Sequence, residues 1–161
     1  MTAGDERAPV CVFAKPPVAG AVKTRLARTE GERRAADLAR AFLVDTLTGL
    51  RAVPWARPIL ATTGPLGALA GPTPEWPQGD GDLGDRLERV LARALTEADQ
   101  SFAIGADSPG LPRAHLERAR ELLVDADAVL GPADDGGFYL LGLRRCPPGL
   151  LHGLPWSTAS T

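Results

Sequence analysis

The sequence predicts an α/β fold with a mostly parallel sheet, because short apolar runs alternate along the chain with longer amphipathic stretches. The alternation occurs three times, which is the pattern of parallel strands joined by crossover helices. Two further apolar runs, residues 126–131 and 138–143, are separated by a glycine-rich turn and predict a hairpin. We therefore expect a three-layer α/β/α sandwich with its functional loops at the carboxyl ends of the strands.

Length and composition are those of one globular domain. With 161 residues, 44% apolar and 24% charged, residues 1–161 are expected to form a single domain in which 1–8 are disordered. The net charge of −2 argues against general nucleic-acid binding. No apolar run is long enough to span a membrane and no signal-peptide core is found, so a cytoplasmic protein without a membrane partner is expected. Cys11 and Cys146 form no motif and are expected to be free thiols.

The first predicted strand, residues 10–13, leads into a basic loop. The strand is short, β-branched and aromatic, as buried strands are. The loop carries Gly20 and the cations Lys15, Lys23 and Arg25. Glycine allows backbone N–H groups to approach phosphate oxygens, and cations neutralise their charge. A phosphate-binding loop and a solvated basic turn both fit this spacing.

Two common nucleotide-binding motifs are excluded. A Walker A loop with its lysine at Lys23 would have Pro17 and Val22 in place of its glycines. Residues 79–84 match the dinucleotide pattern G-x-G-x-x-G, but no strand precedes them and their two aspartates would face a pyrophosphate. These aspartates are better placed to cap a helix.

Helices are predicted from their caps and from apolar periodicity. Thr29 and Glu32 fit a capping box that opens the first helix. Asp80 or Asp82 is placed to cap the second helix, and Pro112 opens the third. The inward faces carry apolar side chains at helical spacing, namely Ala35, Leu38, Ala39, Phe42, Leu43, Leu47 and Leu50, then Leu83, Leu87, Val90, Leu91, Ala94 and Leu95, then Leu116, Ala119 and Leu123.

The remaining strands are short and separated by loops. Apolar runs at residues 59–62 and 101–104 predict strands, whereas 64–78 is rich in glycine and proline and predicts an irregular loop. Asp107 follows the strand at 101–104, where it fits either a turn aspartate that bonds its own backbone or a metal ligand. His115 is expected on the surface, because no second histidine or cysteine lies near it.

Four blocks of the sequence, in order, resemble a bacterial family of the glycosyltransferase-A superfamily, which has the nucleotide-diphospho-sugar transferase fold. The family is often described as a domain of unknown function, or as transferases associated with radical-SAM and selenium-domain proteins. The blocks are Phe-x-Lys-x-Pro-x-x-Gly-x-Val-Lys-Thr-Arg-Leu at 13–26, Gly-Asp-Leu-Gly-x-Arg at 81–86, Gly-x-Asp-x-Pro at 105–109 and Gly-Pro-x-x-Asp-Gly-Gly from 131. Phe138 stands where the family has a tyrosine, and residues 156–158 resemble the family's Trp-Ser-Thr tail.

The resemblance implies a nucleotide site. Its nucleotide and phosphates would be bound by Lys15, Gly20, Lys23, Arg25, Asp82 and Arg86. Asp107 and Asp135 would hold Mg²⁺ or Mn²⁺, and Asp135 could instead act as a base on an acceptor hydroxyl. The Asp-x-Asp motif of the superfamily lacks its second acid here, which leaves metal dependence open. For Asp82, helix capping alone is an alternative explanation.

The implied activity is transfer of a group from a nucleotide-activated donor to an unidentified small acceptor. The leading alternative is glycosyl transfer from a nucleoside diphosphate sugar. A nucleotidyltransferase, similar to the 2-phospholactate or molybdenum-cofactor guanylyltransferases, would instead be attacked at the α-phosphorus of its triphosphate donor. A nucleotide-binding module without turnover is the third alternative.

The resemblance also sets an expectation for the last residues. Family members continue beyond the Trp-Ser-Thr block with further helical structure, whereas this sequence ends at Thr161. Apolar side chains in residues 146–156 are therefore expected to stay partly exposed. A homodimer through that side, or an open acceptor site, would follow.

Overall fold

In the computed structural model, which describes residues 7–156, β1 (Ala8–Ala14) lies inside a six-stranded sheet of order β3-β2-β1-β4-β6-β5. β1 pairs in parallel with β2 (Ala56–Thr62) on one side and with β4 (Ser101–Gly105) on the other. Its residues are buried apart from the half-buried Phe13. The apolar run is continuous because both faces of a parallel sheet are covered.

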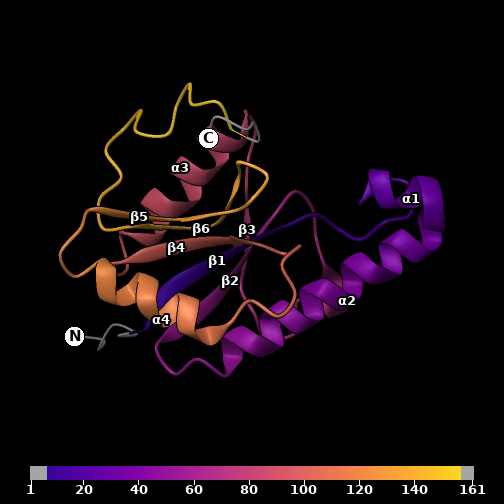
Figure 1. Cartoon of the computed structure of the whole chain (residues 1–161), viewed down its shortest axis with the longest axis horizontal. Helices are drawn as coiled ribbons and strands as arrows, with labels where there is room; N and C mark the ends of the chain where they lie inside the picture. Colours follow the sequence, from indigo (N-terminus) through magenta and orange to yellow (C-terminus); the bar gives the residue numbers. More distant parts are fainter. Residues whose placement is uncertain (1–6, 157–161) are drawn as a thin grey trace.

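Three helices cover the two faces of the sheet (Figure 1). Cys11 and Val12 of β1 point to opposite faces, as neighbours in a strand do. Val12 shares a core with α2 (Glu32–Arg51) and α4 (Arg113–Leu122). Cys11 shares a smaller core with α3 (Leu83–Ala94) on the other face. The predicted three-layer α/β/α sandwich with a mostly parallel sheet is confirmed.

The predicted hairpin consists of β5 (Ala128–Pro132) and β6 (Phe138–Leu143), and β6 lies between β4 and β5. β6 runs antiparallel to both neighbours. Gly142 is needed in β6 because a Cβ there would lie 2.8 Å from Leu123 and 3.0 Å from Phe102. The hairpin therefore packs closely against the end of α4.

Residues 146–156 pass over α3 in turns rather than in a helix or strand. Leu151 is buried in a cluster with Leu87 and Leu91 of α3. Leu150 and Leu154 remain 42% and 46% exposed, so the expected exposure of apolar side chains in this segment is confirmed. Self-association through this side stays a prediction, and residues 157 and 158 of the Trp-Ser-Thr block lie outside the described part of the chain.

The capping box predicted at Thr29 and Glu32 is wrong. Thr29 lies inside a separate short helix, α1 (Thr24–Glu30), where its hydroxyl donates to the carbonyl oxygen of Leu26 at 3.1 Å. A threonine hydroxyl readily bonds a carbonyl in the preceding turn, and here it does so instead of capping. α2 begins after Gly31, whose φ of 86° lets the chain turn between the two helices.

Two loop predictions also need correction. The segment 64–78 contains a 3₁₀ turn, Gly67–Leu69, and the edge strand β3 (Glu75–Pro77), which pairs in parallel with β2. A strand of three residues has too little sequence for an alternating pattern to show. Ala8, assigned to a disordered start, is the first residue of β1 because it pairs with Ala56; residues 1–6 lie outside the described part.

Both cysteines in the described part of the chain are free thiols, as expected. Burial raises the pKa of Cys11 to about 12 and that of Cys146 to about 11. Between residues 7 and 156, no helix has the length and apolar character that crossing a membrane requires.

Candidate functional site

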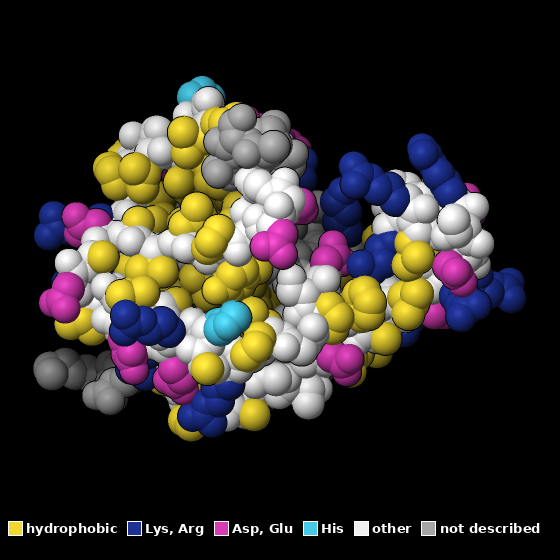
Figure 2. Space-filling model, in the orientation of Figure 1, with side chains coloured by type: hydrophobic (Ala, Val, Ile, Leu, Met, Phe, Trp, Pro, Cys, Tyr) yellow, Lys and Arg dark blue, Asp and Glu magenta, His cyan; other side chains and the backbone are white. Residues whose placement is uncertain are grey.

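A cavity of about 580 Å³ opens at the carboxyl ends of β1 and β4. The end of β1, the loop before α1, the first turn of α3 and the loop after β4 all contribute to its wall. Figure 2 shows Lys and Arg side chains gathered over the α1 end of the molecule, with acidic side chains on the surface next to it. Five of the predicted site residues line this one cavity: Lys15, Lys23, Asp82, Arg86 and Asp107.

Lys23 is the most firmly placed cation of the cavity. Its side chain is only 15% exposed, and Nζ lies 4.5 Å from the centre of the Phe42 ring. Nζ donates to Oδ1 of Asp107 at 2.7 Å, which joins the loop after β1 to the loop after β4. Its backbone has φ of 47°, a left-handed conformation that no other non-glycine residue in the described chain adopts. Such conformations cluster at functional sites.

Asp82 and Arg86 are placed by the start of α3. Asp82 is the N-cap, and its side chain and that of Asp85 close a reciprocal capping box. The predicted cap is therefore confirmed. Arg86 lies one turn further on, and its Nε donates to the carbonyl oxygen of Gly81 at 3.0 Å. This bond fixes the guanidinium at the wall of the cavity.

Three of the predicted residues do not line the cavity. Gly20 has φ of 84° in the turn before α1, a conformation that glycine adopts without strain. Arg25 is exposed on α1. Asp135 is exposed in the β5–β6 turn, where its carboxylate accepts the N–H of Gly137 at 2.9 Å.

Gln78 lines the cavity and was not singled out from the sequence. Its side chain is buried, and its amide donates to the carbonyl oxygens of Ala14 at 3.3 Å and Ala61 at 2.8 Å. It therefore ties the ends of β1 and β2 together beneath the cavity. Neither periodicity nor a sequence motif identifies such a glutamine, because its two backbone partners are distant in the sequence.

Asp107 is a carboxylate of the cavity that could contribute to a divalent cation site. Within residues 7–156, no three His, Cys, Asp or Glu side chains form a metal-binding group. Asp107, however, has a 78% exposed side chain at the cavity, and its hydrogen bond to Lys23 uses only Oδ1. Mg²⁺ commonly takes one or two carboxylates together with substrate phosphates and water. Asp107 alone could supply that carboxylate.

Comparison with known proteins agrees with this fold. A crystal structure from Desulfovibrio desulfuricans G20, named by inference a nucleotide-diphospho-sugar transferase, is 33% identical and has a TM-score of 0.85. The match covers 93% of this chain and 69% of that one. A hypothetical transferase from Thermus thermophilus, 17% identical with a TM-score of 0.54 over 86% of this chain and 65% of that one, shares the fold.

The family comparison gives the same result at the level of sequence. No curated protein matches the chain. Residues 47–158 match the model of the family DUF2064, described as uncharacterized protein conserved in bacteria. The resemblance drawn from the sequence blocks is thereby confirmed, and the chain belongs to this bacterial family of proteins with the nucleotide-diphospho-sugar transferase fold.

Proposed function

We propose that this protein is a transferase that uses a nucleotide-activated donor, with a nucleoside diphosphate sugar as the leading donor class. The observation that carries the proposal is the Lys23–Asp107 ion pair, whose two side chains line a cavity of about 580 Å³ at the carboxyl ends of β1 and β4. Parallel α/β sheets bind their ligands at this edge. The likeness to the D. desulfuricans protein supports the same donor class.

Within the cavity, Lys15, Lys23 and Arg86 would bind the donor diphosphate. Their cationic groups approach from the β1 loop and from α3, so a diphosphate between them would contact both sides of the cavity. Charge-assisted hydrogen bonds of this kind are shorter and stronger than neutral ones. Asp82 is engaged in capping α3, and its contribution would be to hold the turn that carries Gly81.

Asp107 would hold Mg²⁺ or Mn²⁺ together with the donor phosphates. Such a cation, when bound, neutralises the charge that develops on the leaving diphosphate. The Lys23 ammonium would then exchange its contact with Asp107 for one with a phosphate oxygen. Asp135, in the turn between β5 and β6, remains a candidate second ligand or base, and Gly20 and Arg25 remain candidates to contact phosphates from outside the cavity wall.

A thermal-shift screen tests the proposal directly. GDP, UDP and their sugar conjugates are added with and without Mn²⁺, because a ligand that binds only the folded state raises its apparent stability. Stabilisation by at least one nucleotide is expected. Transfer of the sugar from its conjugate to an acceptor hydroxyl or to water should release the nucleoside diphosphate. Release of pyrophosphate from a triphosphate would instead identify a nucleotidyltransferase. A chain that no nucleotide stabilises would contradict a nucleotide site of any kind.

Asp107→Asn is expected to abolish the enhancement of nucleotide binding by Mn²⁺ while the protein stays folded. Asparagine keeps a side-chain oxygen that can accept from Lys23 but lacks the charge that a hard cation requires. The measurement is the ratio of nucleotide affinities with and without Mn²⁺. Asp135→Asn is the matched variant, since an asparagine oxygen can still accept the N–H of Gly137. If only Asp135→Asn removes the metal effect, Asp135 is the ligand and Asp107 is not.

A further inference from the structure

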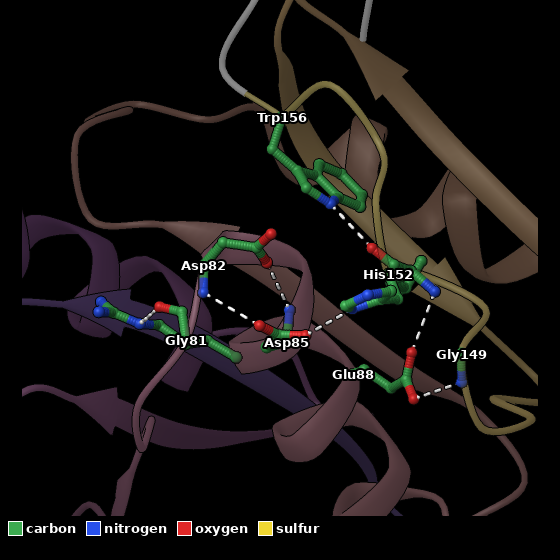
Figure 3. A network of polar contacts seen from close by, with 9 residues as sticks. Gly81, Asp82, Asp85, Glu88, Gly149, His152 and Trp156 are labelled. Carbon is green, nitrogen blue, oxygen red and sulfur yellow. Dashed lines mark hydrogen bonds and ion pairs between the residues drawn. The ribbon is translucent and has the colours of Figure 1, made fainter.

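Carboxylates of α3 fasten residues 146–156 to the helix whose first turn forms a wall of the cavity (Figure 3). The Glu88 carboxylate accepts the N–H groups of Gly149 at 2.7 Å and Leu151 at 3.0 Å. The indole N–H of Trp156 donates to the carbonyl oxygen of Leu151 at 3.0 Å. Residues 149–156 are thus held at several points rather than lying loosely on the helix.

Asp85 links this segment to the turn before α3. Its Oδ2 accepts the N–H of Asp82 at 3.1 Å, while its Oδ1 lies 3.0 Å from Nδ1 of His152. A Cβ on Gly81 would lie 2.5 Å from Oδ2 of Asp85, so the carboxylate rests directly against the Gly81 backbone. Because both oxygens are engaged, His152 restrains the Asp85 side chain that holds the Gly81–Asp82 turn.

The same turn holds Arg86. The Gly81 carbonyl oxygen accepts from Nε of Arg86, and this is the one hydrogen bond of that guanidinium among the described residues. Its two terminal NH₂ groups are therefore left for a ligand in the cavity. Hydrogen bonds lead from His152 through Asp85 to Asp82, next to Gly81 (Figure 3). Arg86 donates to the Gly81 carbonyl oxygen and so completes the connection.

We propose that His152, through Asp85, is a positioning residue for donor binding, a role that rests on the proposed function. In its imidazolium form His152 donates to Asp85 and keeps the Gly81–Asp82 turn in the conformation that aims Arg86 at the donor diphosphate. Nucleotide affinity therefore depends on the charge of a histidine in the C-terminal segment, outside the cavity.

The electrostatic surroundings of His152 favour its charged form. Its hydrogen bond with Asp85 is the main cause that raises the pKa of His152, with smaller contributions from Asp82 and Glu88. Arg89 is a cation that lines, together with Asp85, Glu88 and His152, a shallow surface pocket. The reciprocal bond with His152 is the main cause that lowers the pKa of Asp85. The charge assistance of this contact is therefore fully present below the ordinary histidine pKa, and it is lost as pH rises through the raised pKa.

Binding of GDP and UDP across pH tests the proposal. In the parent protein, affinity should fall about fivefold or more between about pH 6 and about pH 9, a change at the lower end of measured couplings between sites. His152→Asn places an amide N–H near the position of Nδ1 but cannot titrate, so most of this fall should disappear. His152→Ala should bind weakly at both pH values. Ionisation of the nucleotide itself affects every variant equally.

His115→Asn is the matched control, because His115 is the other histidine and it lies exposed on α4 against Tyr139. It should keep the parent's pH dependence. The same pH dependence in His152→Asn as in the parent would overturn the proposal. A parent that binds neither nucleotide would contradict the proposed function as well.

The Arg86 Nε–H signal in NMR spectra supplies a readout that needs no nucleotide. In the parent it should shift with the titration of His152, and in His152→Asn it should not. If the Arg86 Nε–H chemical shift in the parent does not change as His152 titrates, the positioning role is overturned, even where the nucleotides bind well. Failure of the two proposals can thus be told apart.

Discussion

Lys23→Ala is expected to lower the affinity for a nucleoside diphosphate by about 10- to 100-fold, the equivalent of about 1.5–3 kcal/mol for a hydrogen bond to a charged group. Lys23 is the cation whose ammonium is held inside the cavity by Asp107 and the Phe42 ring. The free energy of unfolding should fall by only about 1 kcal/mol, because Asp107 is exposed and the cation–π contact is small. Calorimetric titration and thermal unfolding of the same samples measure the two effects.

Arg25→Ala is the matched control, since it removes the same charge from an exposed position on α1. It should reduce affinity less than Lys23→Ala does, because Arg25 lies outside the cavity wall, where salt screens its charge. Equal losses in the two variants would mean that the loop attracts phosphate by its net charge alone. The assignment of Lys23 as a direct contact would then be wrong.

Gly84→Ala is expected to displace residues 146–156 from α3. A Cβ at position 84 would run into the carbonyl oxygen of Leu151 and the indole nitrogen of Trp156. Overpacking of this kind costs about 1–3 kcal/mol, more than the gain of up to about 1 kcal/mol from placing alanine in a helix. Hydrogen exchange should speed up at the amides of Gly149 and Leu151, which are bonded to Glu88.

Gly49→Ala supplies the comparison for this result. Gly49 lies in α2, and a Cβ there would meet no atom within 4 Å. Alanine should stabilise that helix by up to about 1 kcal/mol, so the same substitution changes sign between the two helices. A Gly84→Ala protein with unchanged exchange at Gly149 and Leu151 would show that the segment shifts and accommodates the methyl group.

The parts of the fold that the sequence predicts correctly depend on neighbouring residues. β1 is a continuous apolar run, α3 has its cap in the same turn, and the β5–β6 hairpin has its glycine turn between two strands. The wrong capping box arises because a local pattern there has two solutions. Thr29 could cap a helix or bond the preceding turn, and Gly31 allowed the second.

The site was predictable only where a residue follows a strand or caps a helix. Lys23 and Asp107 were each expected in a loop, but their contact joins positions 84 apart in the sequence and no spacing encodes it. Glu88 and His152 were not identified for the same reason, since their partners lie on the C-terminal segment and on α3 respectively. Such contacts depend on how the layers pack, and side-chain periodicity does not report that packing.

The labelling rates of the two cysteines can report where the structure opens. The thiolate is the nucleophile that attacks a thiol reagent. Cys11 has no exposed surface in the middle of the sheet and a pKa of about 12, so it should react only when the whole sheet opens. Cys146 is half-buried, and its sulfur lies beside the Glu88 carbonyl. It should react whenever residues 146–156 detach from α3. Two labelling rates from one unmodified protein would thus separate local detachment from global unfolding.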